Sequence, residues 1–98
     1  MSNQGTEQAQ TSKPTLYDKF REEKKALWSH SFDELRNLVD KVGRDKPDTK
    51  ALFASFQVTK TAMSAFQADP DNQELYETAL ARVKETAALE HAYFAAHP

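Results

Sequence analysis

Prolines at positions 14, 47 and 70 divide the chain into segments that each carry a helical repeat of apolar residues. A proline fits the first turn of a helix but disrupts a helix interior, so we expect a helix to begin near each of these positions. Residues suited to caps and turns lie beside them, among them Thr15, Asp48 and Asp69. With 2 glycines and 4 prolines, the chain has too few turn residues for a β-sandwich or barrel. The pattern therefore predicts an all-α fold.

The first segment, residues 15–42, keeps its apolar side chains in one helical phase throughout, and Gly43 follows as a residue that ends helices. This unbroken phase favours one continuous helix, which would be about 40 Å long. A competing signal is present within it. Ser31 and Glu34 have the spacing of a capping box, which would start a new helix after residue 30. A first helix broken near residue 30 is therefore the alternative.

The second segment, residues 48–68, has a stripe of large apolar residues and an opposite stripe of small ones, while the third, residues 70–96, has two apolar lines. These patterns predict an antiparallel up-down-up three-helix bundle formed by a single domain, residues 15–98. Residues 1–14 are polar and Gln-, Ser- and Thr-rich, so we expect a disordered N-terminal tail. The predicted core consists of Tyr17, Phe20, Leu27, Trp28, Phe32, Leu35, Leu38, Val39, Val42, Leu52, Phe53, Phe56, Met63, Phe66, Tyr76, Leu80, Val83, Ala87 and Phe94.

Composition excludes several classes of function. There is no cysteine, and the chain has no stretch of 18 apolar residues that could form a transmembrane helix. Of the three histidines, none has a partner at the spacing of a helical metal site; we expect Glu90 and His91 to be rim residues with solvated tips, and His97 to be frayed. We predict no catalytic, cofactor or metal site, and hence a protein that is not an enzyme. A cytoplasmic location is expected, because the chain lacks cysteines and a signal peptide.

The second segment carries only one charge between residues 51 and 68, Lys60, which is unusual for a helix with a solvated side. This predicts a docking surface for a protein partner or for a second copy of the chain. The function expected is a non-enzymatic interaction module, such as an adaptor, a small chaperone or a regulator. The candidate partner-binding residues are Ala51, Ala54, Val58, Ala62, Ala65, Leu75, Leu89 and Tyr93.

The alternative function is a small regulator that contacts nucleic acid through basic residues of the first helix and first loop. Acidic residues interleave with these basic ones, and the formal net charge of the chain is −2. Both facts favour the protein-interaction hypothesis. The basic residues in question are Lys19, Arg21, Lys24, Lys25, Lys41, Arg44, Lys46 and Lys50.

Overall fold

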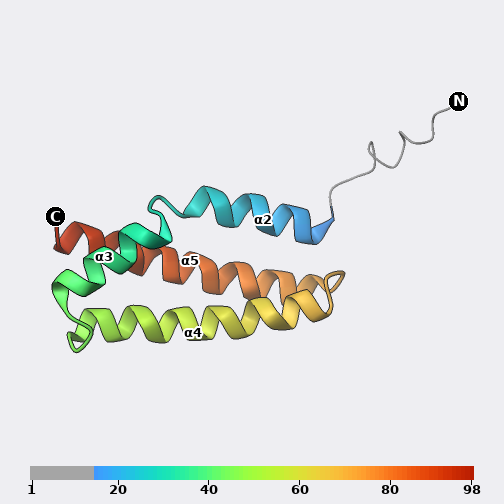
Figure 1. The fold of residues 1–98 in the computed structure, drawn as a ribbon. Coiled ribbons are helices and arrows are strands. Elements are labelled where there is room, and N and C mark those ends of the chain that lie inside the picture. Colours follow the sequence, from blue (N-terminus) through green and yellow to red (C-terminus); the bar gives the residue numbers. More distant parts are fainter. Residues whose placement is uncertain (1–14) are drawn as a thin grey trace, which may run out of the picture.

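The computed structural model describes residues 15–98, and within this range all regular secondary structure is helical (Figure 1). Its four helices are α2 (Leu16–Leu27), α3 (Phe32–Val42), α4 (Pro47–Ala68) and α5 (Gln73–Ala96). The predicted helical class is therefore confirmed. The predicted tail, residues 1–14, lies outside the described residues.

The expected continuous first helix is wrong, because the chain breaks between α2 and α3. Trp28 is extended at the end of α2, and Ser31 caps α3 through its hydroxyl, which accepts from the Glu34 amide at 3.1 Å. The Glu34 carboxylate in turn accepts from the Ser31 amide at 2.7 Å. This capping box satisfies orphan donors at the start of α3, and the alternative signal in the sequence was the correct one.

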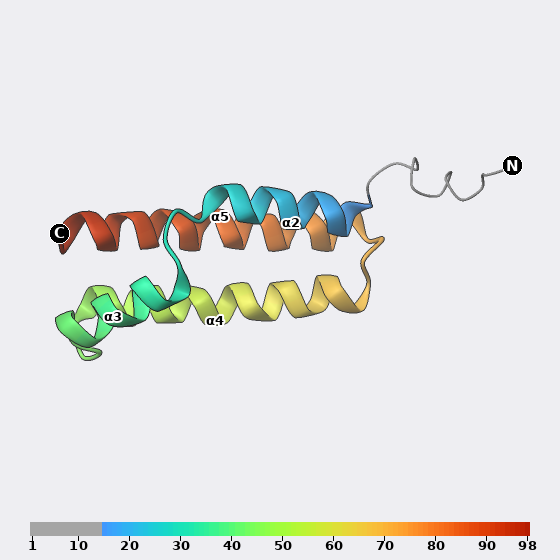
Figure 2. The same cartoon turned by 45° about the horizontal axis from the view of Figure 1, so that its top comes forward.

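The break changes which part of the helical hairpin the chain packs on. Helix α2 lies against α5, and after the connector of residues 28–31 the chain continues as α3, which packs on residues of both α4 and α5 (Figure 2). Gly43 ends α3 with a φ of 114°, a backbone conformation that favours glycine. The three-helix topology is thus replaced by two short helices packed on a long hairpin.

Helices α4 and α5 form that hairpin, joined by a turn around Pro70. Asn72 caps α5, since its side-chain oxygen accepts from the Leu75 amide at 3.2 Å, and its amide group bonds Asp69 at 3.0 Å. The cap places the start of α5 at Gln73, three residues later than the proline suggested. Pro47 begins α4 at the expected position.

Threonines form a polar seam between α4 and α5. The hydroxyls of Thr59 and Thr86 lie 2.7 Å apart, Ser55 also bonds Thr86, and Thr49 lies 2.7 Å from the Tyr93 hydroxyl. The three threonines are at most 3% exposed, although none was among the predicted core residues. Their mutual hydrogen bonds offset the cost of removing hydroxyls from water.

Two apolar clusters flank this seam. The first packs α2 against the hairpin, where Phe66 touches Phe20 and Tyr76 with ring centroids 5.4 and 5.8 Å apart. The second joins α3 to both hairpin helices through Leu35, Val39, Leu52 and Tyr93. Most of the predicted core residues therefore lie in or against these clusters.

Two predicted placements are wrong. Phe32, expected in the core, is 70% exposed although it shares a helix face with the buried Leu35 and Val39, because it is the first residue of α3 and borders an open groove. Glu90, expected at the rim, is 1% exposed.

Candidate functional site

A groove of about 620 Å³ opens where the connector passes from α2 to α3. Its walls come from the end of α2, the connector, α3, the loop after α3, and α4, and one residue of α5 reaches it. We call it the aromatic groove. Its lining residues are Lys24, Trp28, His30, Ser31, Phe32, Leu35, Arg36, Val39, Arg44, Phe53, Phe56, Gln57, Thr59, Lys60, Met63 and Glu90.

Aromatic side chains supply most of the apolar wall of the groove. The rings of Trp28 and Phe56 stack at 5.7 Å between centroids with a 10° angle between their planes. Phe53 is half-buried, and the exposed Phe32 stands on the α3 side. A wall of several aromatic rings is typical of sites that bind apolar side chains or flat ligands.

Four cationic side chains line the groove, Lys24, Arg36, Arg44 and Lys60, whereas Glu90 is the one carboxyl group that lines it among residues 15–98. Arg36 lies over the ring of Phe32 at 5.4 Å, and Arg44 over that of Phe53 at 5.6 Å. These cation–π contacts hold both guanidinium groups beside the apolar wall. Arg36 also pairs with Asp33 at 3.4 Å, and Arg44 with Asp40 at 3.6 Å, whereas Lys24 and Lys60 have no carboxylate partner among residues 15–98. The groove is therefore apolar within and is bordered by cations, of which the two lysines are not offset by a paired acid.

Glu90 joins α5 to the connector. Its Oε2 lies 3.0 Å from Nδ1 of His30, whose ring stacks on that of Phe94 with centroids 3.6 Å apart. A second contact between α5 and the connector runs from Nε2 of His91 to the Ser29 hydroxyl, at 2.9 Å. Glu90 and His91 were expected to be rim residues with solvated tips. Both instead bind the connector to α5, and only the side chain of His91 is largely solvated.

The second carboxyl oxygen of Glu90 has no such partner. Oε1 is buried and makes no hydrogen bond to any group in the described part of the chain; Nε2 of His91 is 3.6 Å away, beyond hydrogen-bond distance. A buried acceptor without a donor costs about 1–3 kcal/mol. Glu90 is among the lining residues, so the groove borders a carboxyl group that still lacks one hydrogen bond.

The eight predicted partner-binding residues do not form one surface. Ala51, Ala54, Ala65 and Val58 lie exposed on α4, with Val58 52% exposed, and Leu89 is 40% exposed on α5.

The other three predicted residues are less accessible. Ala62 and Leu75 are half-buried against the first apolar cluster, and Tyr93 is 3% exposed within the second. None of the eight lines the aromatic groove. The sequence signal that could have located the groove was the capping box at Ser31, since the groove lies at the break.

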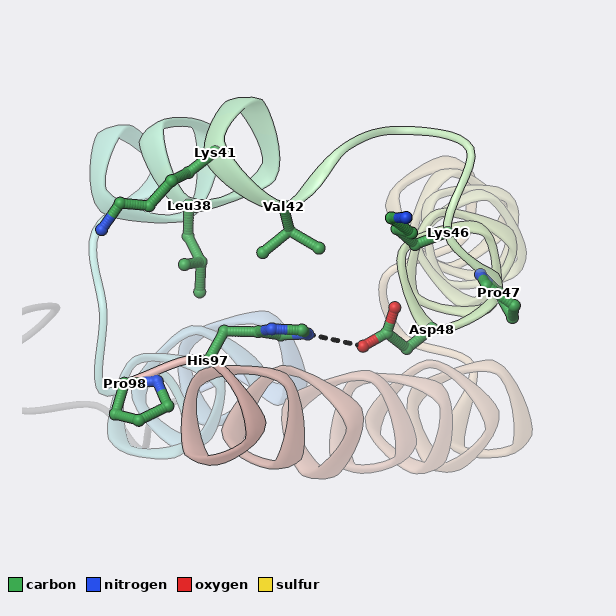
Figure 3. Close-up of a pocket in the computed structure, with 8 residues that line it drawn as sticks. All are labelled: Leu38, Lys41, Val42, Lys46, Pro47, Asp48, His97 and Pro98. Carbon is green, nitrogen blue, oxygen red and sulfur yellow. Dashed lines mark hydrogen bonds and ion pairs between the residues drawn. The ribbon is translucent and has the colours of Figure 1, made fainter.

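A second, smaller depression of about 440 Å³ lies at the opposite end of the hairpin from its turn, where α5 ends beside the start of α4 (Figure 3). There His97 is half-buried and its Nε2 lies 2.7 Å from Oδ2 of Asp48. This hydrogen bond lowers the pKa of the Asp48 carboxyl group below its usual value. His97, expected to fray, instead fastens the end of α5 to α4.

Of the basic residues expected to contact nucleic acid, Lys24 and Arg44 line the aromatic groove, and Lys41 and Lys46 line the smaller depression. They therefore belong to two separate sites. Within residues 15–98, no three side chains of the metal-binding types gather into a group. The four helices described are too short or too polar to cross a bilayer.

No known protein family matches this chain, and no curated protein or solved structure is detectably similar to it.

Proposed function

We propose that the protein is a non-enzymatic interaction module that binds an acidic amphipathic helix of a partner protein in the aromatic groove. The observation that carries this proposal is the combination of an aromatic wall with four cationic side chains around it. An amphipathic helix presents apolar anchors on one face and charges beside them, and apolar grooves on helical proteins recognise this arrangement. Acidic flanking residues would complement the cations.

The exposed ring of Phe32 supports this choice of surface. A phenylalanine 70% exposed beside a groove adds apolar area that a partner can cover. Covering a side chain of this kind is worth about 1.5–3 kcal/mol, which is a useful share of the affinity of a transient complex. Trp28, Phe53 and Phe56 extend the same wall, and aromatic residues are frequent hot spots of binding.

Charge reversal at one edge of the groove tests the proposal. Lys60 lies on α4 and lines the groove, whereas Lys50 lies on the same helix outside it, and both are exposed. Partners captured from the source cell by the unmodified protein should be retained by Lys50→Glu and lost by Lys60→Glu. A captured partner must then bind as a purified segment, with an affinity at least about tenfold weaker for Lys60→Glu. Binding should also weaken as salt rises, because three of the four cations are exposed.

Several outcomes would overturn the proposal. The first is equal loss for Lys50→Glu and Lys60→Glu, which would place binding elsewhere. The second is a loss of partner capture after nuclease treatment, since it would show that the cations of the groove bind nucleic acid. A third is a dimer of the unmodified protein that Lys60→Glu converts to a monomer, in which case the occupant is a second copy of the chain.

A further inference from the structure

We infer that the aromatic groove contains a subsite for an ammonium or guanidinium group at Oε1 of Glu90. The inference rests on the proposed function in naming the source of that group, a lysine or arginine on the apolar face of the partner helix. The subsite itself follows from the side chains of this chain. This subsite predicts a partner helix with acidic residues at the edge of the groove and one lysine or arginine at the centre of the groove.

Glu90 has an unmet capacity for hydrogen bonding. Its Oε2 is held by His30 at 3.0 Å, which fixes the orientation of the carboxyl group, while Oε1 is buried without a donor in residues 15–98. The side chain is 2% exposed, so bulk water does not surround this oxygen. A ligand N–H that reaches Oε1 gains a hydrogen bond in a desolvated place, where such a bond is strong.

The surroundings of Glu90 favour a cationic donor. The groove that Glu90 lines also presents the stacked rings of Trp28 and Phe56, and a cation is attracted both to a carboxylate and to the faces of aromatic rings. A neutral donor gains only from the hydrogen bond. The combination of a carboxyl group and aromatic walls therefore favours an ammonium or guanidinium group over a hydroxyl.

Charges of opposite sign lie at different depths in the groove. The four cations border the groove, and three of them are exposed, whereas Glu90 is buried. Salt screens exposed charges far more than buried ones. An isolated amine is therefore repelled by the edge of the groove and attracted within it, so its binding should hold or strengthen as salt rises. Binding of the acidic partner should show the opposite salt dependence.

Three small probes test the subsite without any partner: phenethylamine, the neutral phenethyl alcohol and the anionic 3-phenylpropionate. Trp28 is the only tryptophan, so its indole N–H gives a single resonance that reports on the groove in a titration followed by NMR. Phenethylamine should shift this resonance in a saturable way, at least about tenfold more tightly than phenethyl alcohol. The anion should show no saturable effect that survives high salt.

Glu90→Gln, with Glu85→Gln as its matched control, tests the role of the carboxyl group. The substituted glutamine keeps an acceptor for His30 but places an uncharged donor at the free position. Glu85 lies on the same helix, and its exposed side chain pairs with Arg82 instead of lining the groove. Glu90→Gln should remove the preference for the amine, and Glu85→Gln should leave it unchanged. Equal binding of amine and alcohol to the unmodified protein would overturn the inference even if Glu90→Gln failed to fold.

The two proposals fail separately. A protein that prefers the amine but binds no acidic helix has the subsite without the proposed function. A protein whose partner binding depends on Lys60 but which does not distinguish amine from alcohol has the proposed function without the subsite.

Discussion

Phe66 occupies the centre of the contact between α2 and the hairpin, and its removal should cost more stability than that of any exposed ring. The side chain is 0% exposed, and its ring centroid lies 5.4 Å from that of Phe20, 5.8 Å from Tyr76 and 6.1 Å from Tyr17. Phe→Ala in a core costs about 3–5 kcal/mol, and each aromatic pair adds about 0.5–1.5 kcal/mol. We expect Phe66→Ala to lower the free energy of unfolding by about 4 kcal/mol. A domain of this size is stable by only about 5–15 kcal/mol.

Urea unfolding followed by far-UV circular dichroism measures this loss as a shift of the midpoint at constant slope. Because Phe66→Ala can leave the chain unfolded without urea, Phe66→Leu serves as the milder variant, with an expected cost of about 1–2 kcal/mol.

The matched control for Phe66 is Phe32→Ala, the same substitution at a ring that is 70% exposed. It removes a cation–π contact with Arg36, which is worth about 0.5 kcal/mol at an exposed site. We therefore expect a loss below about 1 kcal/mol. If Phe32→Ala lowers the free energy of unfolding as much as Phe66→Ala, Phe32 is buried. The first helix would then be continuous, without a break at residues 28–31.

Three further predictions concern polar groups. The hydrogen bond from the Tyr76 hydroxyl to Glu23 raises the pKa of the phenol from its ordinary value of 10.0 to about 12. Its stabilising effect is therefore complete below pH 10.0 and is lost as the pH rises toward about 12, and absorbance at 295 nm should show a late-titrating tyrosine that Tyr76→Phe lacks. Ser31→Ala removes the N-cap of α3 and should lower the free energy of unfolding by about 1 kcal/mol in urea. Thr49→Val and Tyr93→Phe should each cost about 1–3 kcal/mol, but the double variant should cost less than their sum, as a double-mutant cycle would show.

The long hairpin was predictable because its signals are local. Pro47 begins α4 where a proline is tolerated, and Gly43 takes a positive φ before it. Pro70 marks the turn of the hairpin, although the cap at Asn72 starts α5 three residues later than the sequence predicted. The apolar stripes then identify the buried faces. None of these inferences needs knowledge of which helix packs on which.

The break near residue 30 was harder to predict because two local signals disagree. An unbroken apolar phase favours a continuous helix, whereas the capping box of Ser31 and Glu34 favours a restart. The phase is a weaker constraint here, since a break of four residues that ends α2 at Leu27 can keep apolar residues on buried faces of both helices. The capping box supplies hydrogen bonds that only the restart can form.

The polar seam and the Glu90 contact depend on pairing across the fold. Threonine has a polar side chain, so sequence patterns place it at the surface of a helix. Thr59 and Thr86 can be assigned to the core only when the register of α4 on α5 is known. Glu90 falls near the apolar stripe of its helix, yet its partner His30 lies 60 residues earlier in the chain. Helical periodicity alone carries no information on such contacts.

The aromatic groove and the break are one structural feature. A continuous first helix would keep residues 28–42 in line with α2 along α5, whereas after the connector α3 packs on residues of both α4 and α5 (Figure 2). Trp28 at the end of α2 and Phe32 at the start of α3 thereby come to line the same groove, together with Phe56 of α4. The connector is held in place by its contacts with α5, above all the pair of His30 and Glu90. Glu90 thus holds the connector through one carboxyl oxygen while its side chain also lines the groove, so the contact that positions the connector is part of the groove wall.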